Sequence, residues 1–150
     1  MMIYQRIMVA VDGSEISHLA LKEAIRLAKD QKGELRIIHV IDESAVYPTE
    51  SHVDYASLWQ VHREEGLKFL DQISEEVRNE QVPFDCKLVE LKPFAGKIAE
   101  KIGEEAKVWP ADLLVLGTHG RRGLNHLLLG SVAEQIIRIA TTPVLLIRDQ

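Results

Sequence analysis

The sequence predicts an α/β fold: a single doubly wound sheet of five parallel strands with helices on both faces. Five short apolar runs, bounded by turn-forming residues, alternate along the chain with four longer segments whose apolar residues recur at helical spacing. Strands that alternate with helices pair in parallel through right-handed crossovers, and helices then cover both faces of the sheet. No internal repeat, linker or low-complexity tract divides the 150 residues, so we expect one domain spanning residues 1–150.

Two strands and one helix are predicted for the first part of the chain. Ile7–Val11 is a continuous apolar run, as expected for a buried parallel strand. Ser14 can cap the helix that follows, and Lys32 and Gly33 form a typical C-terminal stop for that helix. A second apolar run predicts a strand over Leu35–Ile41.

A polar segment and a long helix come next. Residues 42–56 contain Pro48 and lack clear apolar periodicity, which predicts a loop. The helix after this loop has apolar residues at spacings that would turn them toward the core. Its predicted inward face consists of Leu58, Val61, Phe69, Leu70, Ile73 and Val77.

The second half of the chain is predicted to contain three strands and two helices. Phe84–Leu91 alternates partially and predicts the third strand, whereas Leu113–Leu116 is a short apolar run that predicts the fourth. Apolar residues at helical spacing predict a third helix over Ala95–Ala106 and a fourth over Val132–Ala140. The last strand is expected over Val144–Ile147, directly after a proline.

Glycines and a serine recur at fixed spacing between the fourth strand and the fourth helix. Gly117 and Gly120 are followed by nine residues and then by Gly130 and Ser131. Glycine lets the backbone approach a ligand closely, and a helix N-terminus offers unpaired N–H groups to anions. Ser131 is the expected N-cap, with Glu134 completing a capping box. The segment therefore predicts phosphate binding, with a plain surface turn as the alternative.

The spacing G-x2-G-x9-G-[ST] resembles the nucleotide-binding signature of the universal stress protein family, in its ATP-binding subgroup. Further stretches resemble the same family, so that the resemblance covers essentially the whole chain; they are residues 7–14, 38–41 and 142–147. It implies an adenine nucleotide alpha hydrolase-like fold with strand order 3-2-1-4-5. Strands 1 and 4 are then adjacent at the switch point, where ligands bind beyond the carboxyl ends of the strands.

The resemblance implies an adenine nucleotide, ATP, as the ligand, with Mg or Mn bound through its phosphates. It places Asp12 near the ribose or adenine and gives Val40 the role of holding adenine through its backbone. From the residues alone, a turn-supporting role for Asp12 and a core position for Val40 are the alternatives. Of Arg121 and Arg122, at most one is expected to face the ligand. The complete predicted site is Ala10, Val11, Asp12, Val40, Leu116, Gly117, Gly120, Arg121, Gly130, Ser131 and Val132.

The last strand predicts a homodimer. Its residues are Val144, Leu145, Leu146 and Ile147. In this topology the strand lies at an edge of the sheet, and an exposed apolar edge invites pairing with another chain. The family resemblance implies antiparallel pairing with the same strand of a second copy. The alternative is burial under the chain's own helices, which cover the faces of a sheet and leave its edge open.

Composition and charge narrow the classes of partner. The net charge of −5 argues against a general nucleic-acid binder, which would show a basic face. No apolar run approaches the roughly 18 residues that a membrane span needs, and the N-terminus does not resemble a signal peptide. We therefore expect a cytoplasmic protein without nucleic-acid or membrane partners.

Histidine and cysteine positions predict structural roles rather than a metal site. His39 lies within an apolar strand and is interpreted as a hydrogen-bonded core histidine. Cys86 is the single cysteine and is interpreted as a small buried hydrophobe. The other histidines show no metal-ligand spacing, so no metal site built from protein ligands alone is assigned.

The leading functional hypothesis is an ATP-binding stress-response protein that acts as a nucleotide-dependent switch or partner-binding module. The first alternative is a weak ATPase or nucleotidyl-transfer enzyme. No general base is well placed beside the glycine segment and no Walker lysine is present, so slow hydrolysis is the most that this alternative predicts, and no catalytic residue is assigned. The second alternative is a nucleotide-free dimeric interaction module of the same fold.

Overall fold

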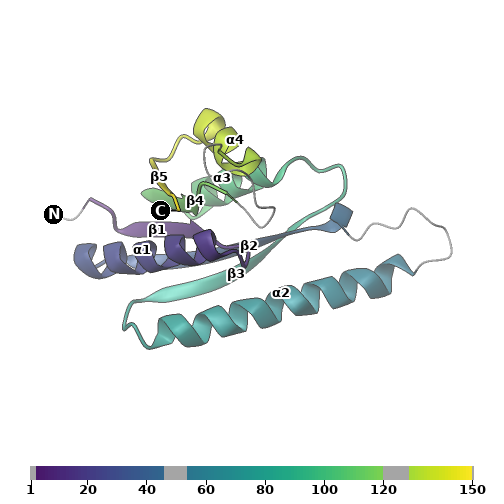
Figure 1. Cartoon of the computed structure of the whole chain (residues 1–150), viewed down its shortest axis with the longest axis horizontal. Helices are drawn as coiled ribbons and strands as arrows, with labels where there is room; N and C mark the ends of the chain where they lie inside the picture. The colour runs from purple at the N-terminus through teal and green to yellow at the C-terminus, as the bar shows by residue number, and fades with distance from the viewer. Residues whose placement is uncertain (1–2, 46–53, 120–128, 150) are drawn as a thin grey trace.

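The computed structural model describes residues 3–45, 54–119 and 129–149 (Figure 1). Its sheet is five-stranded and parallel, in the order β3-β2-β1-β4-β5. The strands are β1 (Arg6–Ala10), β2 (Glu34–Asp42), β3 (Phe84–Leu91), β4 (Leu113–Gly117) and β5 (Val144–Ile147). The predicted fold class and strand order are thus confirmed.

Helices cover both faces of this sheet (Figure 1). They are α1 (Glu15–Gln31), α2 (Tyr55–Arg78), α3 (Ile98–Val108) and α4 (Ser131–Ile139). Ile7 and Val9 of β1 point into the core under α1 and α2, which we call the α1/α2 face. Met8 points into the core under α3 and α4, the α3/α4 face. Because successive strand residues point to opposite faces, β1 contributes to both cores and reads as a continuous apolar run.

The predicted start of α1 is confirmed, whereas its end differs in detail. The Ser14 hydroxyl accepts a 3.2 Å hydrogen bond from the backbone amide of Ser17. The residue in the left-handed conformation at the end of the helix is Lys32, with φ 53°, rather than the glycine that follows it. A Cβ on Gly33 would lie 2.6 Å from the carbonyl oxygen of Gln5. Glycine is therefore required there by the close approach of two backbone segments.

The predicted inward face of α2 is wrong at its N-terminal end. Leu58 and Val61 are 40% and 53% exposed. Trp59 is buried in their place, with the Arg63 guanidinium 5.8 Å from the centre of its ring. The buried residues of the helix are Trp59, Gly66, Leu70, Ile73 and Val77. The first turns of α2 extend well past the N-terminal end of α1 (Figure 1), so α1 does not lie beside them.

Two other predicted boundaries shift. The predicted loop over residues 42–56 begins with the end of β2 and a short 3-10 turn, Glu43–Ala45, and its last residues belong to α2; residues 46–53 lie outside the described residues. Helix α3 begins at Ile98 rather than near residue 95. Phe94 and Gly96 have positive φ values of 64° and 115°, which a right-handed helix does not contain.

Candidate functional site

The carboxyl ends of β1 and β4 lie next to each other, as the switch-point prediction requires. Met8 pairs with Leu114, and Val9 pairs with Val115. The segments that follow these two strands are the turn at residues 12–14 and the glycine-bearing segment that starts at residue 117. Two segments more than 100 residues apart in the sequence therefore lie side by side at the carboxyl ends of the central strands.

The turn after β1 is held by its own side chains. The Asp12 carboxylate accepts hydrogen bonds from the backbone amide and the hydroxyl of Ser14, at 3.0 and 2.6 Å. The Ser17 hydroxyl in turn accepts a 3.2 Å bond from the amide of Asp12. Gly13 between them has a φ of 87°. The turn-supporting role of Asp12 is thus observed, and its role toward a nucleotide stays a prediction.

Both backbone polar groups of Val11 form hydrogen bonds. Its amide donates a 2.9 Å bond to the carbonyl oxygen of Ile38, and its carbonyl oxygen lies 2.8 Å from Nδ1 of His39. A carbonyl oxygen only accepts, so Nδ1 of His39 carries the proton of this bond. The Phe69 ring meets the imidazole edge-on at 4.8 Å. The interpretation of His39 as a hydrogen-bonded histidine is confirmed, although its side chain is half-buried.

Four residues of the predicted site gather on the α3/α4 face at the carboxyl end of the sheet. Leu116 is buried there, and three half-buried side chains pack against the same core: Ala10, Val40 and Val132. Val11 instead packs into the core of the α1/α2 face. These four residues come from β1, β2, β4 and α4. In the sequence, only the family resemblance had assigned them to one site.

Gly117, the last residue of β4, has no room for a side chain. A Cβ at this position would lie 2.9 Å from Cγ2 of Ile16 on α1. The next residue, Thr118, continues the pairing with β5, because its amide donates a 2.9 Å bond to the carbonyl oxygen of Ile147. The Thr118 carbonyl oxygen accepts a 2.6 Å bond from the amide of Gly130. Both ends of the glycine-bearing segment are therefore joined at the end of β4.

The predicted cap of α4 is wrong. Gly130 is the N-cap residue and Ser131 is the first residue of the helix, with no side-chain hydrogen bond to the cap. Glu134 does not complete a capping box; its carboxylate forms a 2.8 Å ion pair with Arg138 one turn later. The extended backbone of Gly130, with φ −67° and ψ 159°, shifts the start of the helix by one residue. Within the described residues, the N-cap supplies no side-chain acceptor to the amides of the first turn.

Two predicted positions lie outside the described residues: Gly120 and Arg121. Beside them, two buried polar atoms lack hydrogen-bond partners within the described part of the chain, Oγ1 of Thr118 and Nδ1 of His119. From the sequence, His119 is a potentially cationic group of the glycine-bearing segment, whereas Thr118 has no signal except its place inside the glycine spacing.

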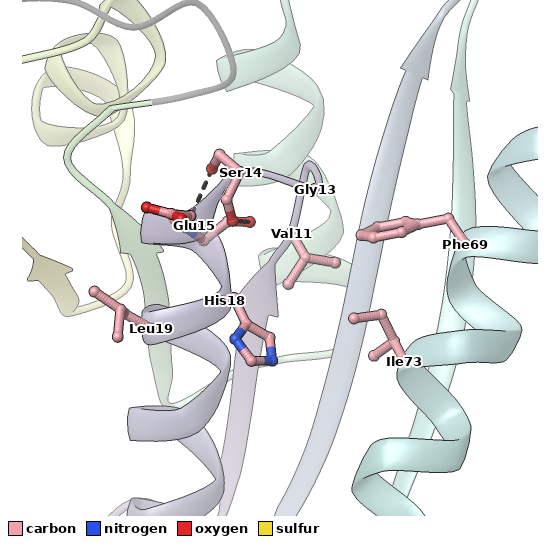
Figure 2. Close-up of a pocket in the computed structure, with 9 residues that line it drawn as sticks. Val11, Gly13, Ser14, Glu15, His18, Leu19, Phe69 and Ile73 are labelled. Carbon is pink, nitrogen blue, oxygen red and sulfur yellow. Dashed lines mark hydrogen bonds between the residues drawn. The ribbon is translucent and has the colours of Figure 1, made fainter.

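A cavity of about 510 Å³ lies on the opposite side, between α1 and α2 (Figure 2). Its lining includes Val11, Gly13, Ser14, His18, Phe69 and Ile73. Two of its polar side chains already have partners: Nε2 of His18 lies 2.6 Å from a Glu76 carboxylate oxygen, and Ser14 is bound within the turn after β1. The cavity belongs to the α1/α2 face and does not include the predicted residues of the α3/α4 face.

Within residues 3–45, 54–119 and 129–149, no three side chains of His, Cys, Asp or Glu come together as a metal site. No helix in the same ranges is both long enough and apolar enough to cross a membrane.

Comparison with known proteins identifies relatives along the full length. The model described as the universal stress protein family matches residues 3–148. The chain is 34% identical to Universal stress protein MJ0531 of Methanocaldococcus jannaschii, over 97% of this chain and 83% of that protein. It is 33% identical to Universal stress protein YxiE of Bacillus subtilis, over 97% and 99%. A universal stress protein family structure from Burkholderia pseudomallei matches with a TM-score of 0.80 at 33% identity, over 98% of both chains. The chain therefore belongs to the universal stress protein family.

Proposed function

We propose that this chain binds ATP or a related adenine nucleotide and acts as a nucleotide-dependent switch or partner-binding module in a stress response. The observation that carries the proposal is the first turn of α4, whose N-cap makes no side-chain hydrogen bond among the described residues and which begins beside half-buried apolar side chains. Helix N-termini favour phosphate groups, and apolar surface favours a purine base. Both features occur on the α3/α4 face.

The phosphates are proposed to bind at the start of α4. The amide of Gly130 is already taken by Thr118, so the donors are the amides of the first helical turn and the Ser131 hydroxyl. These groups lie at the positive end of the helix dipole, which favours negative charge. Gly120 and Arg121 are proposed to take part as well, on the sequence resemblance alone.

The base and ribose are proposed to lie over the ends of β1 and β2. Val40 and Ala10 have half-buried side chains on this face and leave apolar surface for a purine. Asp12 stands in the turn beside them and is proposed to face the ribose or the base. Its carboxylate is far more favourable there than beside phosphates of the same charge.

A divalent cation, Mg or Mn, is proposed to arrive bound to the phosphates. The donor set fits this arrangement, because the start of α4 supplies backbone amides and the Ser131 hydroxyl for phosphate, and Mg²⁺ is usually bound in part through substrate phosphates. When bound, the cation would neutralise phosphate charge. The protein residues named above orient the phosphates and the base.

Solved structures of related proteins support an adenine nucleotide as the ligand class. One is a universal stress protein in complex with cAMP, 22% identical with a TM-score of 0.71. Another is the universal stress protein from Archaeoglobus fulgidus in complex with dAMP, 23% identical with a TM-score of 0.64. At this level of identity they establish a shared fold, and the nucleotides are properties of those two proteins.

Titration calorimetry tests the proposal. Purified protein, shown to be free of carried-over nucleotide, is titrated with Mg-ATP, Mg-GTP and AMP. We expect micromolar binding of Mg-ATP, weaker binding of AMP because it has fewer phosphates, and weaker binding of GTP because the base contacts differ. Assaying phosphate release in the same sample separates a switch from a slow ATPase. Absence of binding to all three nucleotides would contradict the proposal and favour the nucleotide-free interaction module.

A homodimer through β5 is proposed as the assembled form. Within the described residues, β5 pairs with β4 alone, and its four side chains are all half-buried. The opposite edge strand, β3, carries Asp85, Lys87 and Glu90, each in an ion pair. Charged residues on an edge strand oppose pairing with another chain, and an apolar edge favours it. The contrast between the two edges supports β5 as the interface with a second copy.

A further inference from the structure

The backbone hydrogen bonds between β1 and β2 stop before β2 ends. The two strands pair in register as far as Ala10 and Ile38, and the last bond runs from the amide of Val11 to the carbonyl oxygen of Ile38, at 2.9 Å. In a continuing parallel pair, the next bond would join the amide of Val40 to the carbonyl oxygen of Val11. Within the described residues this bond is not formed, although β2 extends to Asp42.

The side chain of His39 occupies the acceptor that this missing bond would use. Its Nδ1 donates a 2.8 Å hydrogen bond to the carbonyl oxygen of Val11. Two contacts from α2 fix the imidazole: the Phe69 ring meets it edge-on at 4.8 Å, and a Cβ on Gly66 would lie 3.6 Å from its Cδ2. The carbonyl of Val11 is therefore directed to a side chain of β2 instead of to the amide of Val40.

The amide of Val40 is consequently left facing β1 without a backbone partner among the described residues. Val40 is half-buried, and a peptide amide that is removed from water without a hydrogen bond costs free energy. Purine rings carry nitrogen atoms that accept hydrogen bonds. The side chains of Val40 and Ala10 pack on the α3/α4 face, where the base is proposed to lie.

We propose that His39 is a positioning residue for the nucleotide base. By binding the carbonyl of Val11, its imidazole keeps the amide of Val40 available to an acceptor nitrogen of the purine ring. The inference rests on the proposed function and adds one residue to it; His39 acts through Val11 and Val40 and does not itself touch the ligand. Without the imidazole donor, the amide of Val40 and the carbonyl of Val11 would pair and lengthen the parallel ladder.

The substitution His39→Leu removes the donor and tests this inference by calorimetry. We expect Mg-ATP to bind roughly 3- to 10-fold more weakly, because one hydrogen bond between neutral groups is lost. Mg-tripolyphosphate, which has three phosphates and no base, should bind both proteins equally. A general disturbance of the site would instead weaken both ligands together.

Two further variants are the controls for this substitution. The side-chain amide of His39→Asn places a donor at the same distance from the backbone as Nδ1 of histidine, so Mg-ATP affinity should be retained. His62→Leu makes the same chemical change at a half-buried histidine of α2 and should alter the affinity for neither ligand.

Amide hydrogen exchange at Val40, followed by NMR, tests the inference without relying on affinity. In the wild-type protein without nucleotide, we expect the amide of Val40 to exchange faster than that of Ile38, which lies within the ladder. Mg-ATP should slow exchange at Val40. In His39→Leu, the amide of Val40 should exchange slowly even without nucleotide, because it has gained the carbonyl of Val11 as a partner.

The possible outcomes separate the inference from the proposed function. If His39→Leu keeps the wild-type preference for Mg-ATP over Mg-tripolyphosphate, the role of His39 is wrong and the proposed function stands. Exchange at Val40 as slow as at Ile38 in the nucleotide-free wild-type protein would also overturn the inference alone. Equal wild-type affinity for Mg-ATP and Mg-tripolyphosphate would overturn the inference together with the proposed base subsite. If the wild-type protein binds no adenine nucleotide, the proposed function falls as well.

Discussion

The amide of Gly130 donates a 2.6 Å hydrogen bond to the carbonyl oxygen of Thr118. This bond joins two residues twelve positions apart, and it ties the N-cap of α4 to the end of β4. The hydrogen bond thereby fixes the start of α4 beside the end of β4. Any anion bound at this helix N-terminus would therefore be held at a fixed height above β4.

Replacing Gly130 with valine tests whether this helix start holds phosphate. The φ of Gly130 is −67°, which valine also adopts, so the fold should be kept at a cost of about 1 kcal/mol for a poorer N-cap. The branched side chain would stand where the backbone must approach the ligand. We expect at least about tenfold weaker binding of Mg-ATP by calorimetry. Gly103→Ala, on the neighbouring helix α3, is the control and should bind normally.

Unchanged affinity of Gly130→Val would mean that the phosphates bind elsewhere. Circular dichroism melting of the same samples distinguishes lost binding from lost structure.

Replacing two helical glycines with alanine should affect the free energy of unfolding differently. A Cβ on Gly103 would meet nothing closer than Cδ1 of Ile139 at 4.0 Å, so Gly103→Ala should raise the free energy of unfolding by about 0.5 to 1 kcal/mol. A Cβ on Gly66 would lie 2.9 Å from Cδ1 of Leu88 and 3.3 Å from Cγ2 of Ile41. Crowding should cancel or outweigh the gain in helix propensity at Gly66. Urea titrations that rank Gly66→Ala as the more stabilising change would contradict this assignment.

The β5 interface is tested with a charge. Leu145→Lys places an ammonium group on an apolar edge strand, where a charged side chain opposes pairing with a second copy. We expect sedimentation equilibrium to show a dimer for the wild-type chain and a monomer for this variant. Leu67→Lys, at a leucine of α2 that is 49% exposed, should leave the dimer intact. A dimer that survives Leu145→Lys would exclude this edge as the interface.

Cys86 should react slowly for a thiol. Burial raises its pKa, and the Ser74 hydroxyl lies 3.3 Å from its sulfur. Because the thiolate is the reactive form, a raised pKa lowers the reactive fraction at pH 8. We expect slower modification by a disulfide reagent in the folded protein than in denaturant, with the rate rising as the pH increases. Cys86 is the single cysteine, so the absorbance change reports one site. Equal rates in the two conditions would show that the thiol is accessible.

Most of the fold was predictable because the structure that each local sequence pattern favours is also the structure that the segment has in the sheet or in the helices that cover it. Continuous apolar runs such as the one at Ile7–Val11 marked strands buried on both faces, and Ser14 marked the start of α1 through a cap that the structure contains. The errors arose where tertiary contacts override local pattern. Leu58 and Val61 have helical spacing but remain exposed, and Gly130 rather than Ser131 is the N-cap of α4 because the backbone of Gly130 is extended.

The sequence by itself determined the strand–helix alternation, the glycine spacing and the family to which the chain belongs, because these are properties of order along the chain. Only the tertiary structure decided which neighbouring groups share a face. It placed Val40 with Leu116 and separated both from Val11, and among the described residues it gave the buried Thr118 hydroxyl no hydrogen-bond partner. Side-chain direction and hydrogen-bond satisfaction depend on segments far apart in sequence, and periodicity within one segment carries no information about them.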